Sequence, residues 1–163
     1  MLQHAWQLGV QDSVALLDPV SRPALADLHH QADVILAPLT HNDRNMVQGC
    51  CPLKVLEAMS SGTPLVASDL PVVRELANAD SEAILVRPGS AKAIKDGLLR
   101  LADEPSLAHR LSVAARQRVE QHFTWGRAQT TLTESYDSLL SVCSANSVTR
   151  LSNTSSRAAS TSE

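Results

Sequence analysis

Short apolar segments alternate with helix-forming segments through most of this chain, and this alternation constrains the fold more than any other feature. Apolar runs of about four to eight residues between turn signals are typical of buried strands. The sequence predicts such strands at residues 13–17, 34–37, 64–68 and 83–86. Because helical or long irregular segments separate these runs, the strands are expected to lie parallel with helices on both faces. We therefore predict a doubly wound α/β fold built on a parallel sheet.

The segments around the strands carry the signals of helix ends. A helix is predicted at 52–61, with Pro52 inside its start and Gly62 just past its end. Further helices are predicted at 2–9, 22–31 and 72–77, and from residue 91 onward the chain is predicted to be helical. Residues 144–163 break the pattern, because ten of these twenty residues are Ser or Thr. We predict one partial domain over 1–143 and a disordered Ser/Thr-rich tail over 144–163.

Composition excludes several classes of protein. A net charge of −3 argues against non-specific nucleic-acid binding, and no apolar run approaches the ~18 residues of a membrane span. The three cysteines, Cys50, Cys51 and Cys143, are too few for a disulfide scaffold and indicate free thiols in a reducing compartment. The adjacent pair lacks metal-chelating spacing, so we interpret Cys50 and Cys51 as small packing residues. Since the first residues lack a secretory signal, a cytoplasmic location is expected.

The irregular segment 38–51 and the helix after it carry the most specific chemical signal. In parallel sheets, ligands bind beyond the carboxyl ends of the strands, where this segment begins. A helix start there offers free backbone N–H groups to a phosphate, and because Pro52 has none, Leu53 and Lys54 are the expected donors. Glu57 interrupts a small and apolar helix, and a carboxylate can accept hydrogen bonds from two neighbouring ribose hydroxyls. Together these features predict a site for a nucleoside diphosphate.

The segment from Pro52 to Ser68, P-L-K-V-L-E-A-M-S-S-G-T-P-L-V-A-S, resembles the donor-binding signature of retaining GT-B glycosyltransferases of group 1. The resemblance extends to residues 32–38, 69–76 and 84–89 and covers roughly residues 5–142. In that family a C-terminal Rossmann-like domain binds a nucleotide-sugar donor, and an N-terminal domain binds the acceptor. The resemblance therefore implies transfer of a sugar from a nucleoside diphosphate to a sugar or lipid-linked acceptor, with no cofactor and no essential metal.

The same resemblance assigns roles to residues but leaves the catalytic residue unknown. It implies that Glu57 binds the ribose as the second glutamate of an E-x7-E motif, and that the backbone at Leu53 and Lys54 binds the diphosphate. Gly49 stands where the first glutamate of that motif is expected. Contacts to the donor sugar are then expected from Arg44, Asn45, Gln48 and the backbone at Gly49.

Each of these assignments has an alternative. Glu57 would instead pair with Lys54 on the same helix, while Lys54 would be a solvated lysine and Arg44 an ordinary loop charge. A solvated face is expected for the basic helix carrying Arg110, Arg116 and Arg118, with peripheral contact on an acidic membrane as the second interpretation.

Alternatives also exist for the whole chain. The family's N-terminal domain and the first two strands of its donor domain have no counterpart in this sequence, so the strand at 13–17 is expected to lack a neighbour and the chain to be marginally stable. A non-catalytic nucleotide-binding module or an inactive remnant is the alternative function. A nicotinamide-dependent enzyme is disfavoured, since no G-x-G-x-x-G follows any predicted strand.

Overall fold

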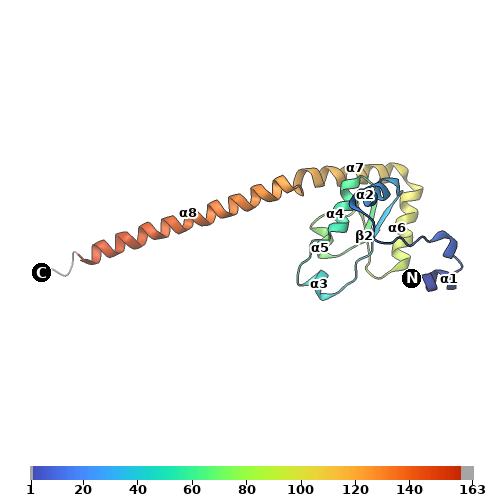
Figure 1. Cartoon of the computed structure of the whole chain (residues 1–163), viewed down its shortest axis with the longest axis horizontal. Coiled ribbons are helices and arrows are strands. Elements are labelled where there is room, and N and C mark those ends of the chain that lie inside the picture. Colours follow the sequence, from blue (N-terminus) through green and yellow to red (C-terminus); the bar gives the residue numbers. More distant parts are fainter. Residues whose placement is uncertain (1, 159–163) are drawn as a thin grey trace. The chain divides into compact units, whose positions relative to one another are not determined.

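The computed structural model describes the backbone of residues 2–158 and the side chains of residues 3–141 (Figure 1). The chain divides into two compact units, residues 1–116 and 117–163. The elements, in chain order, are α1 (Leu2–Gln7), the 3-10 helix η1 (Gln11–Ser13), α2 (Arg22–Gln31), β1 (Ile35–Ala37), α3 (Asp43–Met46), α4 (Leu53–Ser61), β2 (Leu65–Ser68), α5 (Pro71–Arg74), β3 (Ile84–Val86), α6 (Ala91–Asp103), α7 (Pro105–His122) and α8 (Trp125–Ala158).

The sheet consists of three parallel strands in the order β1-β2-β3. Leu36 pairs with Val66 across the first ladder, and Ala67 pairs with Leu85 across the second. The central strand β2 is buried along its whole length, as expected for a parallel strand covered on both faces. These observations confirm the predicted doubly wound α/β class. They also confirm three of the four predicted strands, those at 34–37, 64–68 and 83–86.

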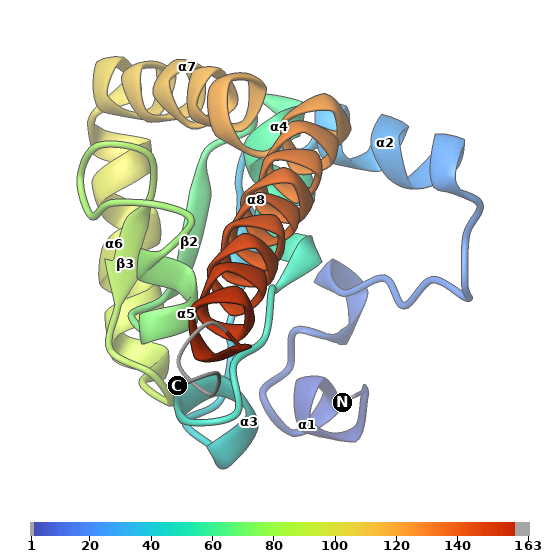
Figure 2. The ribbon, with the colours of Figure 1, turned by 90° about the vertical axis from the view of Figure 1, so that its left-hand side faces the viewer.

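Helices cover both faces of this sheet (Figure 2). On one face Val66, Ile84 and Val86 form a core with Leu101 of α6 and with Leu107 and Leu111 of α7. Gly97 lets α6 approach closely there, since a Cβ at this position would lie 3.2 Å from Ile84 and 3.3 Å from Val86. On the other face α4 packs against β1 and β2, and α2 packs on α4. A hydrogen bond from the Thr63 hydroxyl to the His29 carbonyl, 2.7 Å long, joins the end of α2 to the turn before β2.

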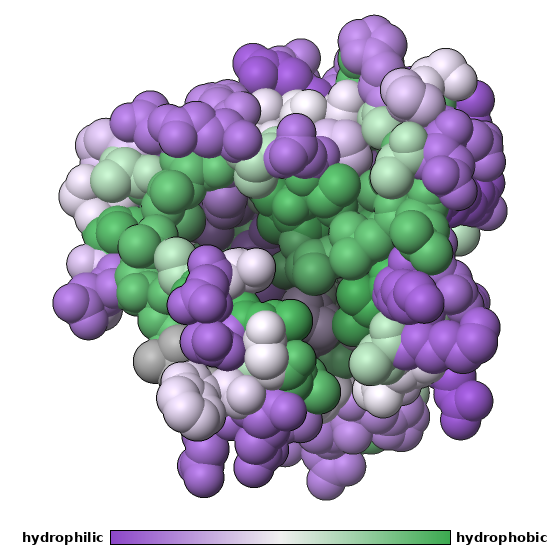
Figure 3. Space-filling view, turned by 90° about the vertical axis from the view of Figure 1, so that its right-hand side faces the viewer, coloured by the Kyte–Doolittle hydropathy of each residue, from purple (hydrophilic) through white to green (hydrophobic). Residues whose placement is uncertain are grey.

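The predicted strand at 13–17 is wrong. η1 ends at Ser13, and the residues after it form no regular element, with Leu16 53% and Leu17 64% exposed. A short apolar run becomes a strand only where a neighbouring strand accepts its backbone hydrogen bonds, and no described strand lies beside this one. Apolar side chains accordingly remain exposed over parts of the surface (Figure 3). Trp6 and Leu8, which precede this segment, are also exposed.

The outer edge of β1 is therefore an edge of the described sheet. The N–H of Ile35 donates to the carbonyl of Pro64 at 2.9 Å, so Ile35 and Ala37 direct their backbone groups toward β2. Since alternate residues of a parallel strand bond to opposite sides, the N–H and C=O of Leu36 point away from β2. Leu36 is also 43% exposed, which leaves both its backbone and its side chain at this edge.

The C-terminal helices begin where the sequence predicts them. The Ser90 hydroxyl accepts from the N–H of Ala93 at 3.2 Å and caps α6, and the Thr124 hydroxyl accepts from the N–H of Arg127 at 3.3 Å at the start of α8. α8 continues to Ala158, through part of the segment 144–163 for which the composition predicts disorder, and residues 159–163 lie outside the described part. Over the described residues, no helix combines the length and apolarity needed to cross a membrane.

Candidate functional site

A pocket of about 460 Å³ lies where the chain leaves the carboxyl end of β1. It is lined by residues 38–40, Asn42, Arg44 and Asn45 from the loop and α3, and by residues 50–54 around the start of α4. The carboxyl ends of parallel strands are the usual ligand-binding edge of such sheets. The structure thus brings together Arg44, Asn45, Leu53 and Lys54, four of the residues that the sequence predicts for the site.

The N-terminus of α4 contributes backbone donors to this pocket. Pro52 is the N-cap and has no N–H, and the first bond of the helix runs from the N–H of Val55 to the carbonyl of Pro52 at 2.8 Å. The N–H groups of Leu53 and Lys54 have no acceptor among the described residues. Unpaired donors at a helix start, together with the positive end of the helix dipole, suit an anionic group.

A hydrogen-bonded unit of Thr40, Asn42 and Asn45 forms the wall contributed by the loop and α3. The Asn42 side chain accepts from the N–H of Asn45 at 3.0 Å and caps α3, while its amide nitrogen donates to the Thr40 hydroxyl at 3.0 Å. Asn45 is only 7% exposed, and its amide nitrogen donates to the carbonyl of Thr40 at 2.7 Å. The sequence analysis missed Thr40 and Asn42, although the spacing of Asn42 and Asn45 matches an N-cap followed by its third helical residue.

The two charged side chains that line the pocket are both cationic. Arg44 and Lys54 are exposed, and neither forms an ion pair with any described side chain. Salt bridges in the described part of the chain lie elsewhere, for example between Arg74 and Asp69. The pocket therefore combines two cations with two free backbone donors.

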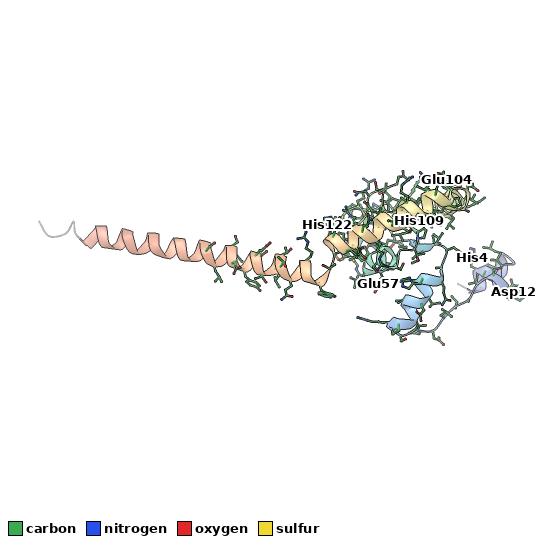
Figure 4. The ribbon with its side chains drawn as sticks, turned by 90° about the horizontal axis from the view of Figure 1, so that it is seen from above. His4, Asp12, Glu57, Glu104, His109 and His122 are labelled. Carbon is green, nitrogen blue, oxygen red and sulfur yellow. The ribbon has the colours of Figure 1, made fainter. Side chains whose placement is uncertain are left out.

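Glu57 lies outside the lining of the pocket but on the adjoining face of α4. Val55, Ala58 and Met59 form the buried stripe of this helix, and Glu57 lies off that stripe and is exposed. Its spacing of four residues from Leu53 places both on one face, one turn apart. Figure 4 labels Glu57 on α4. Its carboxylate makes no ion pair or hydrogen bond with a described residue, so the alternative pairing with Lys54 is not formed.

Gln48 and Gly49 are exposed and do not line the pocket. Gly49 has a φ of +76°, in the left-handed region, and no atom lies within 4 Å of the position of a Cβ. Glycine is thus required there by backbone conformation and not by space. The E-x7-E motif that this segment resembles has its first glutamate at this position. In this chain a glutamate there would need the same strained backbone or a rearranged loop.

The cysteine pair differs from its predicted role. Cys50 is partly buried, whereas Cys51 is exposed, and both line the pocket as free thiols. The packing interpretation is therefore wrong for Cys51. Over the described residues, no group of three or more His, Cys, Asp or Glu side chains is placed to hold a metal ion.

An ion pair lies at the carboxyl end of the central strand. The Arg74 guanidinium donates from Nη2 to Asp69 Oδ2 at 2.7 Å, and this hydrogen bond holds the pKa of the Asp69 carboxyl below its ordinary value. The Asp69 N–H donates to the carbonyl of Val86 at 2.8 Å, which ties the chain leaving β2 to the end of β3.

Known proteins resemble this chain in sequence and in fold. The family model described as "Glycosyl transferases group 1" matches residues 1–118. An MMP alpha-(1->4)-mannosyltransferase of Mycolicibacterium hassiacum is 34% identical over 120 residues, which cover 73% of this chain and 28% of that protein. A D-inositol 3-phosphate glycosyltransferase of Xylanimonas cellulosilytica is 32% identical over 132 residues, covering 81% of this chain and 30% of that protein. The chain thus spans less than a third of the length of these relatives.

Solved structures show the same fold. A sucrose-phosphate synthase of Thermosynechococcus elongatus superposes with a TM-score of 0.73 at 23% identity, over 86% of this chain and 33% of that protein. Alr3699/HepE of Anabaena, in complex with UDP and glucose, superposes with a TM-score of 0.72 at 18% identity, over 83% of this chain and 35% of that protein.

The parallel sheet and its two helical layers define a Rossmann-like domain, with a pocket beyond β1 at the start of α4. The architecture is that of the C-terminal domain of GT-B glycosyltransferases. The chain belongs to the family of group 1 glycosyl transferases.

Proposed function

We propose that this chain is the donor-binding part of a retaining glycosyltransferase that transfers a sugar from a nucleoside diphosphate to a hydroxyl acceptor. The observation that carries the proposal is the start of α4, where the N–H groups of Leu53 and Lys54 lack acceptors beside a pocket lined by Arg44 and Lys54. Relatives named as glycosyltransferases and a UDP complex of a protein with the same fold support it.

Each part of the donor has a proposed contact. The diphosphate binds the N–H groups of Leu53 and Lys54, where the helix dipole and the two cations favour its negative charge. The ribose hydroxyls donate to the carboxylate of Glu57, which is unpaired among the described side chains and lies one turn further along the same face. Donor-sugar contacts come from Arg44 and Asn45 in the pocket, with Gln48 and the backbone of Gly49 in the adjoining loop.

The proposed reaction breaks the bond between the anomeric carbon and the diphosphate oxygen. The electron pair leaves with the diphosphate, the acceptor hydroxyl oxygen bonds to the anomeric carbon on the same face of the sugar, and its proton passes to the departing diphosphate. Stabilising the departing charge is the main contribution of this chain, since donors fixed in advance toward a developing anion are an effective form of catalysis. The reaction needs no metal in this proposal, and the acceptor is held by a part of the enzyme outside this chain.

Calorimetry with UDP, GDP and ADP tests the proposal on the full chain. At least one nucleotide should bind, and Glu57→Ala should weaken its binding about tenfold or more, because it removes charge-assisted hydrogen bonds to the ribose. The matched control is Glu75→Ala, an exposed glutamate outside the pocket, which should leave binding unchanged.

A deoxyribose analogue separates the ribose contact from a general effect of charge. The unsubstituted chain should bind the 2′-deoxy form of its preferred nucleotide more weakly than the ribose form. Glu57→Ala should bind both forms equally, because the group that distinguishes them is gone. If Glu57→Ala weakened the binding of the ribose form and of the 2′-deoxy form by the same factor, the ribose role of Glu57 would be contradicted. If none of the three nucleotides bound to the unsubstituted chain, the proposal would be overturned.

A further inference from the structure

Two free thiols line the same pocket, and the proposed function uses neither of them. Cys50 is partly buried and Cys51 is exposed, immediately before the N-cap residue Pro52. A side chain at this position shares the cavity with Arg44, Lys54 and the start of α4. Any group attached to Cys51 would therefore occupy space that a ligand of the pocket needs.

The charges of the pocket select the kind of reagent that reaches this thiol. Its charged lining residues are Arg44 and Lys54, and no aspartate or glutamate belongs to the lining. Nearby cations attract a reagent that carries negative charge. An anionic disulfide is thus favoured over a neutral one of similar size.

The two cysteines are poorly placed to form a disulfide with each other. Adjacent Cα atoms are about 3.8 Å apart across a trans peptide bond, whereas disulfide-bonded residues usually have Cα atoms about 4.4–6.8 Å apart. The described peptide bonds are all trans. A mixed disulfide formed on Cys51 is therefore not readily displaced by its neighbour, and it persists until an external thiol removes it.

We propose that Cys51 is a site of thiol–disulfide exchange with small anionic disulfides of the glutathione class, and that the resulting adduct closes the pocket to the nucleotide. The consequence for the nucleotide rests on the proposed function, whereas the reactivity of Cys51 does not. The Cys51 thiol releases its proton to water, and the thiolate attacks one sulfur of the disulfide. A new S–S bond forms, the original one breaks, and the departing thiolate takes up a proton. Cys51 is oxidised, and half of the reagent is reduced.

The reaction rates of two disulfide probes with the folded full chain test the site. The probes are dianionic dithiobis(nitrobenzoate) and neutral dithiodipyridine, with the modified residue located by peptide mass spectrometry. Cys51 should react before Cys50, and its rate ratio of anionic to neutral probe should exceed that of the same chain unfolded in urea. Cys51→Ser should remove the fast reaction, and Cys50→Ser should retain it.

Charge variants test whether the pocket sets this preference. Arg44→Gln or Lys54→Gln should each lower the anionic-to-neutral ratio roughly two- to fivefold, in line with the strength of exposed charge pairs. Lys95→Gln is the matched control, since Lys95 is an exposed lysine of α6 outside the pocket, and it should leave the ratio unchanged. A ratio equal to that of the unfolded chain, or equal in all three variants, would overturn the proposal.

Protection by nucleotide distinguishes the two proposals. Saturating UDP, or whichever nucleotide calorimetry shows to bind, should slow modification of Cys51, and the glutathione adduct should lose nucleotide binding until dithiothreitol restores it. Binding without protection would refute the closing of the pocket. If no nucleotide binds but Cys51 still shows its selective, anion-favoured reaction, the proposed function fails while the exchange site stands.

Discussion

The side-chain amide of Asn45 donates to the carbonyl oxygen of Thr40 at 2.7 Å and connects the start of α3 to the loop that leaves β1. The donor of this bond is buried, since Asn45 is only 7% exposed, whereas the acceptor residue Thr40 is exposed. A residue predicted to contact a ligand thus also stabilises the wall of the pocket. The two roles are separable, because the hydrogen bond uses the amide nitrogen and leaves the side-chain oxygen without a partner among the described residues.

Asn45→Ala should destabilise the fold by about 0.5–1.5 kcal/mol, because it removes the hydrogen bond from the largely buried Asn45 amide to the carbonyl of Thr40. The free energy of unfolding in urea, followed by circular dichroism, measures this change. Gln48→Ala is the control, since Gln48 is exposed and its side chain forms no hydrogen bond or ion pair with a described residue, and its effect should stay within about 0.5 kcal/mol. If both variants lost similar amounts of the free energy of unfolding, the hydrogen bond from Asn45 would not be a specific source of stability.

Gly97→Ala should lower stability although alanine favours helices. Helix propensity alone predicts a gain of about 1 kcal/mol, but a Cβ at 3.2 Å from Ile84 and 3.3 Å from Val86 overpacks the core, at a cost of about 1–3 kcal/mol. Gly126→Ala in α8 meets no atom within 4 Å and should show no such loss. Urea unfolding of the two variants compares them, and a net gain for Gly97→Ala would show that the strands yield to the extra methyl group.

Gly49→Glu should not restore the missing first glutamate of the motif. Since no atom lies within 4 Å of a Cβ at Gly49, Gly49→Ala and Gly49→Glu should each cost about 1–2 kcal/mol from the left-handed backbone alone. Their free energies of unfolding should therefore agree closely. If Gly49→Glu proved as stable as the unsubstituted chain while Gly49→Ala did not, the glutamate side chain would have gained a contact that the structure does not show.

The pair of Asp69 and Arg74 should make stability depend on acidic pH. The hydrogen bond from Arg74 holds the pKa of Asp69 below its value in the unfolded chain. The stabilisation by this pair is therefore fully present above the ordinary pKa of 3.8, and it is lost as the pH falls through the lowered pKa. Asp69→Asn should therefore destabilise the chain at neutral pH, and the difference should shrink in strong acid. Urea unfolding at a series of pH values from neutral to strongly acidic measures it.

A control for this pH dependence removes the other partner. Arg74→Gln should reduce the acid-dependent loss to the same degree as Asp69→Asn, because either substitution abolishes the hydrogen bond that lowers the pKa. A full acid dependence that survives in both variants would assign it to other groups.

The three strands that the sequence predicts correctly and the strand that it predicts wrongly have the same local pattern of apolar residues. The runs at 34–37, 64–68 and 83–86 became strands because each has a partner in the sheet. The run at 13–17 is just as apolar, yet it remains exposed, because pairing depends on residues distant in the chain and leaves no local mark. The opposite case is the long helix α8, whose Ser/Thr-rich end has no apolar repeat from which a helix would be predicted.

The site was predictable where its parts are close in sequence. Residues 38–54 supply the whole pocket, so the loop, the helix start and the two cations could be identified from their order alone. The positive φ of Gly49, the burial of Asn45 and the exposure of Cys51 depend on how the loop bends, which composition does not encode. The roles of Glu57, Leu53 and Lys54 toward a ligand stay predictions.

The order of the strands also bears on how the chain acquires its structure. Each strand of the sheet lies beside the next one in the sequence, so no described connection has to pass over another strand. Loops that join sequential neighbours close at a lower entropic cost than connections between distant segments, and folding rates rise as contacts become more local. β2 takes part in both ladders, so its pairing with either neighbour prepares the surface for the third strand. The sheet can thus nucleate on β2, which follows α4 in the chain, and the start of α4 beside the pocket should become organised early in folding.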